Sequence, residues 1–158
     1  MSKTNDLIQL LDHVASMLGK QSDQVLQEQL GIGVSQFKIL QALETEPRTT
    51  QKEIARELGQ TEASISRQVK VMLGMGLLHS LRSPEDHREH ITAVTRKGER
   101  LAEAAKAALD RYHRPTLAAL SEKQYEQLLA TLEAIHRSIC AESHIKPRVD
   151  QTVLTFTK

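Results

Sequence analysis

The chain has 158 residues, and its 21 Lys and Arg nearly balance its 20 Asp and Glu, which leaves a formal net charge of +1. This length suits one compact domain, or one domain with a dimerisation module. The charge balance excludes a uniformly basic nucleic-acid binder. No stretch approaches the roughly 18 apolar residues of a membrane span, and residues 1–6 lack a signal-peptide pattern. We therefore expect a cytoplasmic protein without a membrane partner.

The charges are nevertheless distributed unevenly along the chain. Residues 48–100 hold ten Lys and Arg against seven Asp and Glu, a net charge of +3, and the remaining residues carry −2. Contact with nucleic-acid phosphates requires such a local positive excess. The excess is modest, so it supports a nucleic-acid contact in this segment without deciding it.

An apolar stripe near the N-terminus predicts a helix within residues 1–33. A domain of this size offers too few partners to cover so wide an apolar face, so we interpret it as a dimerisation helix. A helical core within one chain is the alternative. The stripe repeats at helical spacing and comprises Leu7, Leu10, Leu11, Val14, Met17 and Leu18.

Within residues 34–98, two short helices joined by a tight turn are expected. Thr50 and Glu53 have the spacing of a capping box at a helix start. Gly59 follows the apolar positions of that helix, where a left-handed residue commonly ends a helix. Thr61 is placed to cap the second helix, which has a buried stripe of Ile65, Val69 and Met72. This order predicts a helix-turn-helix, although a chance pair of helices can show the same spacing.

The second helix carries polar side chains on its remaining positions. Arg67 is placed to approach a guanine edge and Gln68 an adenine, whereas hydroxyl groups suit the DNA backbone. A solvated polar face is the alternative interpretation. The candidate DNA-binding residues of this helix are Thr61, Ser64, Ser66, Arg67, Gln68 and Lys70.

A hairpin is predicted next, between residues 77–81 and 90–94, which are rich in β-compatible residues. The segment 82–89 between them is polar and too charged to be buried. Arg82 and Arg88 are candidate DNA contacts, with Arg88 suited to a narrow minor groove. Asp86 is placed either to orient the arginine or to set the turn. The alternative is a solvated surface hairpin.

The chain resembles the MarR (multiple antibiotic resistance regulator) family of transcription factors over roughly residues 5–142. The resemblance rests on residues 35–40, on residues 51–59 and 61–78, on the wing pattern at 82–88, and on the Thr-x-x-Gly motif at 95–98. Such regulators are similar in being homodimers with one winged helix-turn-helix unit per subunit. The resemblance places Ser64, Ser66 and Arg67 on the recognition helix and Asp86 and Arg88 at the wing tip.

We therefore expect a mainly α protein (α+β), in which a winged helix-turn-helix at 34–98 lies between dimerisation helices at 1–33 and 99–142. In a homodimer, the two recognition helices would face successive major grooves about 34–36 Å apart, so the operator should be a pseudopalindromic inverted repeat of double-stranded DNA.

The C-terminal helices are predicted from an alanine-rich stretch at residues 96–112, which Pro115 kinks or ends, and from a second capping box at Ser121 and Gln124. The helix that follows is expected to bury Tyr125, Leu128, Leu129, Leu132, Ile135 and Ile139. Residues 143–158 are interpreted as a flexible tail or as an arm on the partner subunit.

The sequence does not identify a ligand. The resemblance implies a small organic effector bound near the dimer helices, but a repressor without a ligand is equally compatible with these residues. No cofactor and no metal site are expected, because the histidines are scattered without the spacing of a metal site. Cys140 cannot form an internal disulfide, and we interpret it as a small hydrophobe, not a redox switch.

The sequence predicts a homodimeric, sequence-specific DNA-binding regulator, and a repressor before an activator. A helical protein-interaction module without DNA binding is the alternative. We do not expect an enzyme, because Ser83, Asp86 and His87 crowd one exposed loop without an arrangement that would stabilise an oxyanion.

Overall fold

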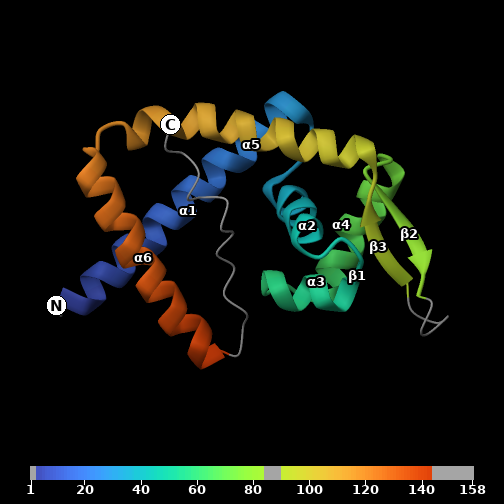
Figure 1. Ribbon diagram of the computed structural model, residues 1–158, viewed down its shortest axis with the longest axis horizontal. Coiled ribbons are helices and arrows are strands. Elements are labelled where there is room, and N and C mark those ends of the chain that lie inside the picture. The colour runs from blue at the N-terminus through green and yellow to red at the C-terminus, as the bar shows by residue number, and fades with distance from the viewer. Residues whose placement is uncertain (1–2, 84–89, 144–158) are drawn as a thin grey trace. The chain divides into compact units, whose positions relative to one another are not determined.

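The computed structural model describes residues 3–83 and 90–143, with side chains up to residue 139. It divides into two compact units, Met1–His113 and Arg114–Lys158, and the boundary falls inside the fifth helix. The described residues are mainly helical, with one small antiparallel sheet, as the sequence predicts (Figure 1). In chain order the elements are α1 Lys3–Leu30, α2 Val34–Thr45, β1 Thr49–Thr50, α3 Gln51–Leu58, α4 Glu62–Gly74, β2 Leu78–Arg82, β3 His90–Val94, α5 Arg96–Leu117 and α6 Glu122–Ser143.

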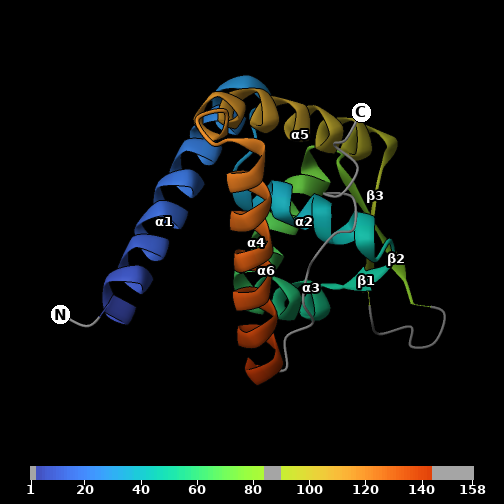
Figure 2. The same ribbon diagram turned by 60° about the vertical axis from the view of Figure 1, so that its left-hand side comes forward.

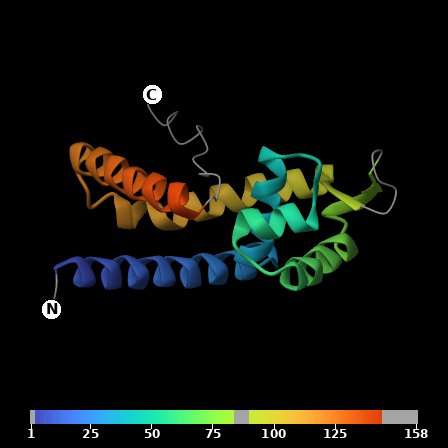
Figure 3. The same cartoon turned by 90° about the horizontal axis from the view of Figure 1, so that it is seen from below.

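The helix-turn-helix is formed by α3 and α4, which lie next to each other in Figures 1 and 3. The predicted capping box is confirmed at the start of α3: Thr50 N donates to Glu53 Oε2 at 3.0 Å, and Glu53 N donates to Thr50 Oγ1 at 3.2 Å. Gly59 ends α3 with φ +61°, a left-handed conformation that glycine adopts at low cost. Thr61 Oγ1 then accepts from Ser64 N at 3.1 Å and caps α4.

The core of the first unit is apolar and comes mainly from α1, α2, α3, α4 and α5, with further side chains from β2 and from the connections after α1 and α4. Its side chains pack at the density of a protein interior, so they fix the angle between the two helices of the turn. The predicted stripe of α4 is confirmed as part of this core, which also contains Ala55 of α3. The fully buried members with the largest volumes include Leu26, Ile32, Ile39, Leu40, Ile54, Ile65, Met72 and Leu77.

The sheet has the strand order β1-β3-β2, and both pairings are antiparallel (Figure 2). The predicted hairpin is confirmed: Leu78 pairs with Val94 and Arg82 with His90. Strand β1, whose two residues Thr49 and Thr50 pair with β3, was not predicted from the sequence. Arg82 belongs to β2, and Ser83, expected in an exposed loop, is buried at 6% exposure. Residues 84–89, the expected tip of the hairpin, lie outside the described residues.

Helix α5 is longer than expected. Of the two expectations for Pro115, an end of the helix is not observed, because α5 continues to Leu117, and a kink stays a prediction. A proline removes one backbone donor and crowds the preceding turn, but here it lies only two residues before the helix end, so most of the helical hydrogen bonds are unaffected. Arg114 O still accepts from Ala118 N at 2.9 Å.

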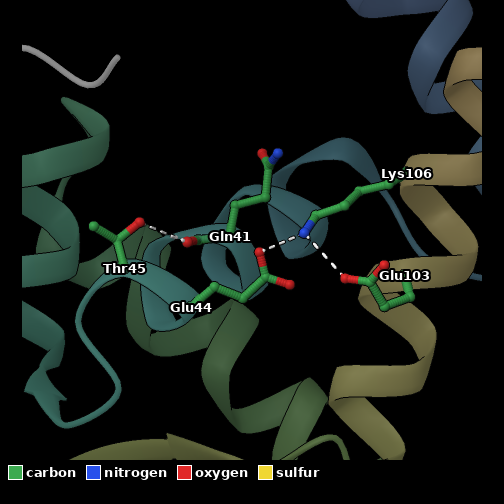
Figure 4. A network of polar contacts seen from close by, with 5 residues as sticks. All are labelled: Gln41, Glu44, Thr45, Glu103 and Lys106. Atoms are coloured by element: carbon green, nitrogen blue, oxygen red, sulfur yellow. Dashed lines mark hydrogen bonds and ion pairs between the residues drawn. The ribbon is translucent and has the colours of Figure 1, made fainter. Parts of the chain in front are cut away.

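An ion-pair network joins α5 to α2 (Figure 4). Lys106 Nζ lies 2.8 Å from Glu44 Oε2 on α2 and 3.1 Å from Glu103 Oε1 on its own helix. The hydrogen bond to Glu44, more than any other contact, raises the pKa of Lys106. All three side chains are partly exposed, so the network contributes little to stability and mainly sets the position of α5 on α2.

The two terminal helices expose their apolar faces within one chain. On α1, Leu7, Leu10 and Val14 are 51%, 59% and 45% exposed. On α6, the residues that the sequence analysis expected to be buried are exposed or half-buried: Tyr125, Leu128, Leu132 and Ile139 are exposed, and Leu129 and Ile135 are half-buried. A helical core within one chain, the alternative interpretation, is therefore not supported for this face, and its burial by a second chain stays a prediction. The predicted capping box is confirmed, since Ser121 N donates to Gln124 Oε1 at 2.9 Å and Gln124 N to Ser121 Oγ at 3.3 Å.

Candidate nucleic-acid interface

Helix α4 turns one face to the core and the opposite face to solvent. Ile65, Val69 and Met72 are buried at 1% exposure or less. Arg67 lies two positions from both Ile65 and Val69, which at about 100° per residue places it on the opposite side of the helix. The exposed side chains on and around this outward face are Ala63, Ser66, Arg67, Lys70 and Val71. The outward face thus projects two cations and short side chains away from the body of the unit.

The hydroxyl residues at the start of α4 have a structural role as well. Thr61 is exposed, and its oxygen accepts the capping hydrogen bond from Ser64 N. Its hydroxyl hydrogen remains able to donate to a phosphate. Ser64 is half-buried and donates through Oγ to Gln60 Oε1 at 3.3 Å, and Gln68 is also half-buried. Of the predicted residues on α4, Thr61, Ser66, Arg67 and Lys70 are therefore the more accessible.

A hollow of about 610 Å³ lies beside the turn between α3 and α4. It is lined in part by Lys52 and Arg56, one turn apart on α3 and both exposed. In helix-turn-helix proteins the first helix of the pair crosses the DNA backbone, and cations there bind phosphates. The sequence analysis counted these two cations but did not place them at the site. Their spacing of four residues, outside the apolar positions of α3, was the signal that could have identified them.

Glu53 connects the sheet to the turn. Its Oε2 accepts from Thr50 N at 3.0 Å and from Thr49 Oγ1 at 2.7 Å. The backbone donor of Thr50, followed by the hydroxyl of Thr49, lowers the pKa of Glu53 below its ordinary value of 4.5. The ionised carboxylate is thus the form that holds β1 against the first turn of α3.

We expect the stability that Glu53 contributes to depend on pH. Because its pKa is lowered in the folded state, this contribution is fully present above pH 4.5 and is lost as the pH falls through the folded pKa. Glu53→Gln should therefore be less stable than wild type at neutral pH, and the difference should shrink on acidification. Urea denaturation followed by circular dichroism over this pH range measures it. A difference that stayed constant down to low pH would contradict this role for the carboxylate.

The C-terminal end of α4 is anchored by the start of α5. Thr95 Oγ1 lies 2.7 Å from Gly76 O and 3.1 Å from Leu77 O, to which its hydroxyl donates, and it accepts from Gly98 N at 3.1 Å. One hydroxyl therefore caps α5 and satisfies carbonyl groups just after α4. Lys97 Nζ also donates to Met75 O at 2.7 Å. These contacts explain the Thr-x-x-Gly motif physically: it fixes the end of the outward-facing helix to α5.

Gly98 is predicted to tolerate no side chain. A Cβ at this position would meet Leu77 O at clashing distance and Val94 Cγ1 at 2.9 Å. Since one neighbour is backbone, Gly98→Ala should lower the free energy of unfolding by about 1–3 kcal/mol. Gly74→Ala is the matched control, because no atom lies within 4 Å of its Cβ position and alanine favours a helix. Denaturation at one fixed protein concentration compares them, and equal stabilities of Gly98→Ala and wild type would refute the tight contact.

The hairpin contributes Arg82 to the same unit. This side chain is exposed on β2, opposite His90 of β3, whose Nδ1 lies 3.2 Å from Ser80 Oγ. The two remaining predicted wing residues, Asp86 and Arg88, lie outside the described residues. Their contact with DNA stays a prediction.

Within residues 3–83 and 90–143, no group of three or more His, Cys, Asp or Glu side chains is placed to hold a metal ion. His113 on α5 instead has Nε2 2.9 Å from Ser22 Oγ on α1. Over the same described ranges, no helix combines the length and the apolar character needed to cross a membrane.

A model of the MarR family matches residues 30–89, which cover the helix-turn-helix, β2 and the adjoining wing segment. Over these residues the chain is similar to the MarR family of transcription regulators. The matched segment has the DNA-binding fold of a winged helix-turn-helix.

Two curated relatives are described as transcriptional regulators. The chain is 26% identical over 118 residues to the HTH-type transcriptional regulator BilQ of Clostridium symbiosum. This match covers 75% of the present chain and 79% of BilQ. It is 24% identical over 109 residues to the uncharacterised HTH-type transcriptional regulator YdgJ of Bacillus subtilis. That match covers 69% of this chain and 66% of YdgJ, just under two thirds of the relative.

Solved structures share the fold. A cysteine-to-serine mutant of MarR from E. coli has a TM-score of 0.75 at 20% identity, over 82% of this chain and 95% of that one. The same mutant complexed with operator DNA has a TM-score of 0.67 at 21% identity. This match covers 85% of the present chain and 99% of the mutant. CouR from Rhodococcus jostii RHA1, bound to p-coumaroyl-CoA, has a TM-score of 0.70 at 24% identity. This match covers 85% of the present chain and 94% of CouR.

Proposed function

We propose that this protein is a regulator of the MarR type, a cytoplasmic homodimeric repressor that binds an inverted-repeat operator through α4 and the wing. The single observation that carries the proposal is the outward face of α4. Arg67 and Lys70 are exposed there, opposite a fully buried apolar stripe, on a helix anchored at both ends. A helix held in this way projects its cations at a fixed angle, as major-groove recognition requires.

The contacts divide into two classes. Arg67 and Gln68 are proposed to contact base edges, because guanidinium and amide groups form paired hydrogen bonds with guanine and adenine. The remaining residues would position the protein on phosphates. This second set adds the two cations of α3 to the predicted list and comprises Lys52, Arg56, Thr61, Ser64, Ser66, Lys70 and Arg82. Arg88 is proposed for the minor groove, where negative potential attracts arginine, and Asp86 is proposed to orient this arginine or to set the turn.

Dimerisation is proposed for residues 1–33 and 99–142, with DNA binding by residues 34–98. The exposed apolar faces of α1 and α6 support this division, because each helix carries a set of large hydrophobic side chains that its own unit leaves exposed. Two copies would bring two α4 helices to one DNA duplex. The operator should then have two half-sites related by inversion.

The proposal includes a small organic effector. CouR, which shares the fold, is described as bound to p-coumaroyl-CoA, and this supports a ligand that changes the DNA affinity of the present protein. Such a ligand acts by binding one dimer conformation more tightly than the other. The chemical class of this ligand can be identified by screening small molecules for those that change DNA binding in the assay described next.

The experiment that tests the proposed function is a selection of operator DNA from a random pool, followed by fluorescence anisotropy in a salt titration. We expect selective binding to an inverted repeat, with an affinity that falls steeply as the salt concentration rises. Scrambled DNA of the same composition is the control. Equal binding to selected and scrambled DNA at every salt concentration would overturn the proposal and favour a protein-interaction module.

A further inference from the structure

The outward face of α4 carries one apolar side chain that the contacts proposed above do not use. Val71 is 51% exposed, more than Leu73 at 36%, the other exposed large hydrophobic of this helix. A single exposed valine on a protein surface needs no explanation in general. This one differs by its position, because it follows Arg67 by four residues and directly adjoins Lys70.

Helix geometry prevents Val71 from joining the core. At about 100° per residue, it lies on one row with Ser64 and Arg67, and about 100° or more around the helix from each of the buried residues Ile65, Val69 and Met72. Leu73, in contrast, lies at the border between the buried stripe and the Lys70 side. Any molecule that Arg67 contacts from this row will therefore also meet Val71.

The neighbouring positions permit close approach. Ala63 and Gly74 are exposed and lie on the outward face near the two ends of α4. Neither has a long side chain, so the helix backbone can approach a groove closely at both ends. Val71 itself has two methyl groups on a β-branched side chain, which is stiff in a helix and presents a fixed apolar surface.

The major groove of DNA offers one apolar group, the 5-methyl of thymine, and small apolar side chains contact it. We propose that Val71 reads a thymine methyl in each operator half-site. This inference rests on the proposed DNA binding. Four helical residues span about 6 Å, so the thymine should lie within about two base pairs of the base that Arg67 contacts. The flanking cations Arg67 and Lys70 favour nucleic acid over an apolar protein partner as the occupant of this face.

The test removes the methyl group from the DNA and leaves the protein unchanged. Each thymine of the selected operator is replaced in turn by uracil, which differs only by this methyl, and dissociation constants are measured for wild-type protein. We expect one position per half-site at which uracil weakens binding about three- to fivefold, the effect of losing one buried methyl contact. At this position, Val71→Ala should bind thymine and uracil operators equally.

Leu73→Ala is the matched control, since it truncates an exposed apolar residue on another side of the same helix. It should keep the full sensitivity to uracil. Equal binding of wild type to thymine and uracil operators at every position would overturn the inference and leave the proposed function standing, as would unchanged sensitivity in Val71→Ala. Wild-type protein that failed to distinguish selected from scrambled DNA would overturn the proposed function itself.

Discussion

Arg67→Ala is expected to weaken binding to the selected operator by about 5- to 150-fold, the range measured when a paired contact to a base is lost. Arg67 is exposed on the outward face of α4, opposite the buried stripe, so its removal leaves the core intact. Anisotropy with selected and scrambled DNA, across a range of salt concentrations, measures the effect. Circular dichroism and denaturation should show a fold and a stability close to wild type.

The salt dependence distinguishes the two roles that this arginine can have. If Arg67 contacts a base, the variant loses selectivity, and the slope of log affinity against log salt stays near that of wild type. If it contacts a phosphate, affinity falls for all DNA sequences, and the slope decreases by about one. Arg111→Ala, which removes an exposed arginine from α5, is the matched control and should bind as wild type does. Unchanged operator affinity in Arg67→Ala would remove α4 from the proposed interface.

The parts of this fold that the sequence predicted are those that local chemistry determines. The capping box of Thr50 and Glu53, the left-handed Gly59 and the cap at Thr61 each depend on residues at most four positions apart. The buried stripe of α4 follows from helical periodicity alone. Such features locate the recognition helix and identify its outward face, which is why the candidate residues Ser66, Arg67 and Lys70 could be named in advance and are exposed in the structure.

Features that depend on distant residues were missed or left unexplained. The short strand β1 exists because Thr49 and Thr50 pair with Thr92 and Ile91, some forty residues away. No periodicity announces a strand of two residues. The Thr-x-x-Gly motif supported the family resemblance, but the sequence alone did not explain its structural role. The structure explains it, because the hydroxyl of Thr95 donates to the carbonyl groups that follow α4.

The C-terminal helices show a different limit. The sequence pattern of α6 correctly predicted an amphipathic helix and its cap. Within one chain, Tyr125, Leu128, Leu132 and Ile139 are exposed, and their burial by a second chain stays a prediction. Periodicity shows which residues share a face and not what covers that face. The same ambiguity applies to α1, because the sequence does not show what covers its apolar face. A charged side chain placed on that face tests whether a second chain covers it.

Leu10→Asp is expected to convert the protein from dimer to monomer at micromolar concentration. Leu10 is 59% exposed in the single chain and shares its face with Leu7 and Val14. If a second chain covers this face, each large side chain contributes about 1.5–3 kcal/mol of burial, and an unpaired carboxylate in the interface adds a desolvation cost of several kcal/mol. Sedimentation velocity over a concentration series measures the association state.

The same variant should bind the inverted repeat at least about 100-fold more weakly, because two half-site contacts are no longer linked in one molecule. Its affinity for a single half-site should match that of wild type, since α4 and its anchors are untouched. Gln9→Asp is the matched control: it adds the same charge one residue away, on the side of α1 opposite Leu7 and Val14. This control should stay dimeric and bind the full operator. If Leu10→Asp also stays dimeric, α1 does not form the dimer interface, and its exposed face has some other role.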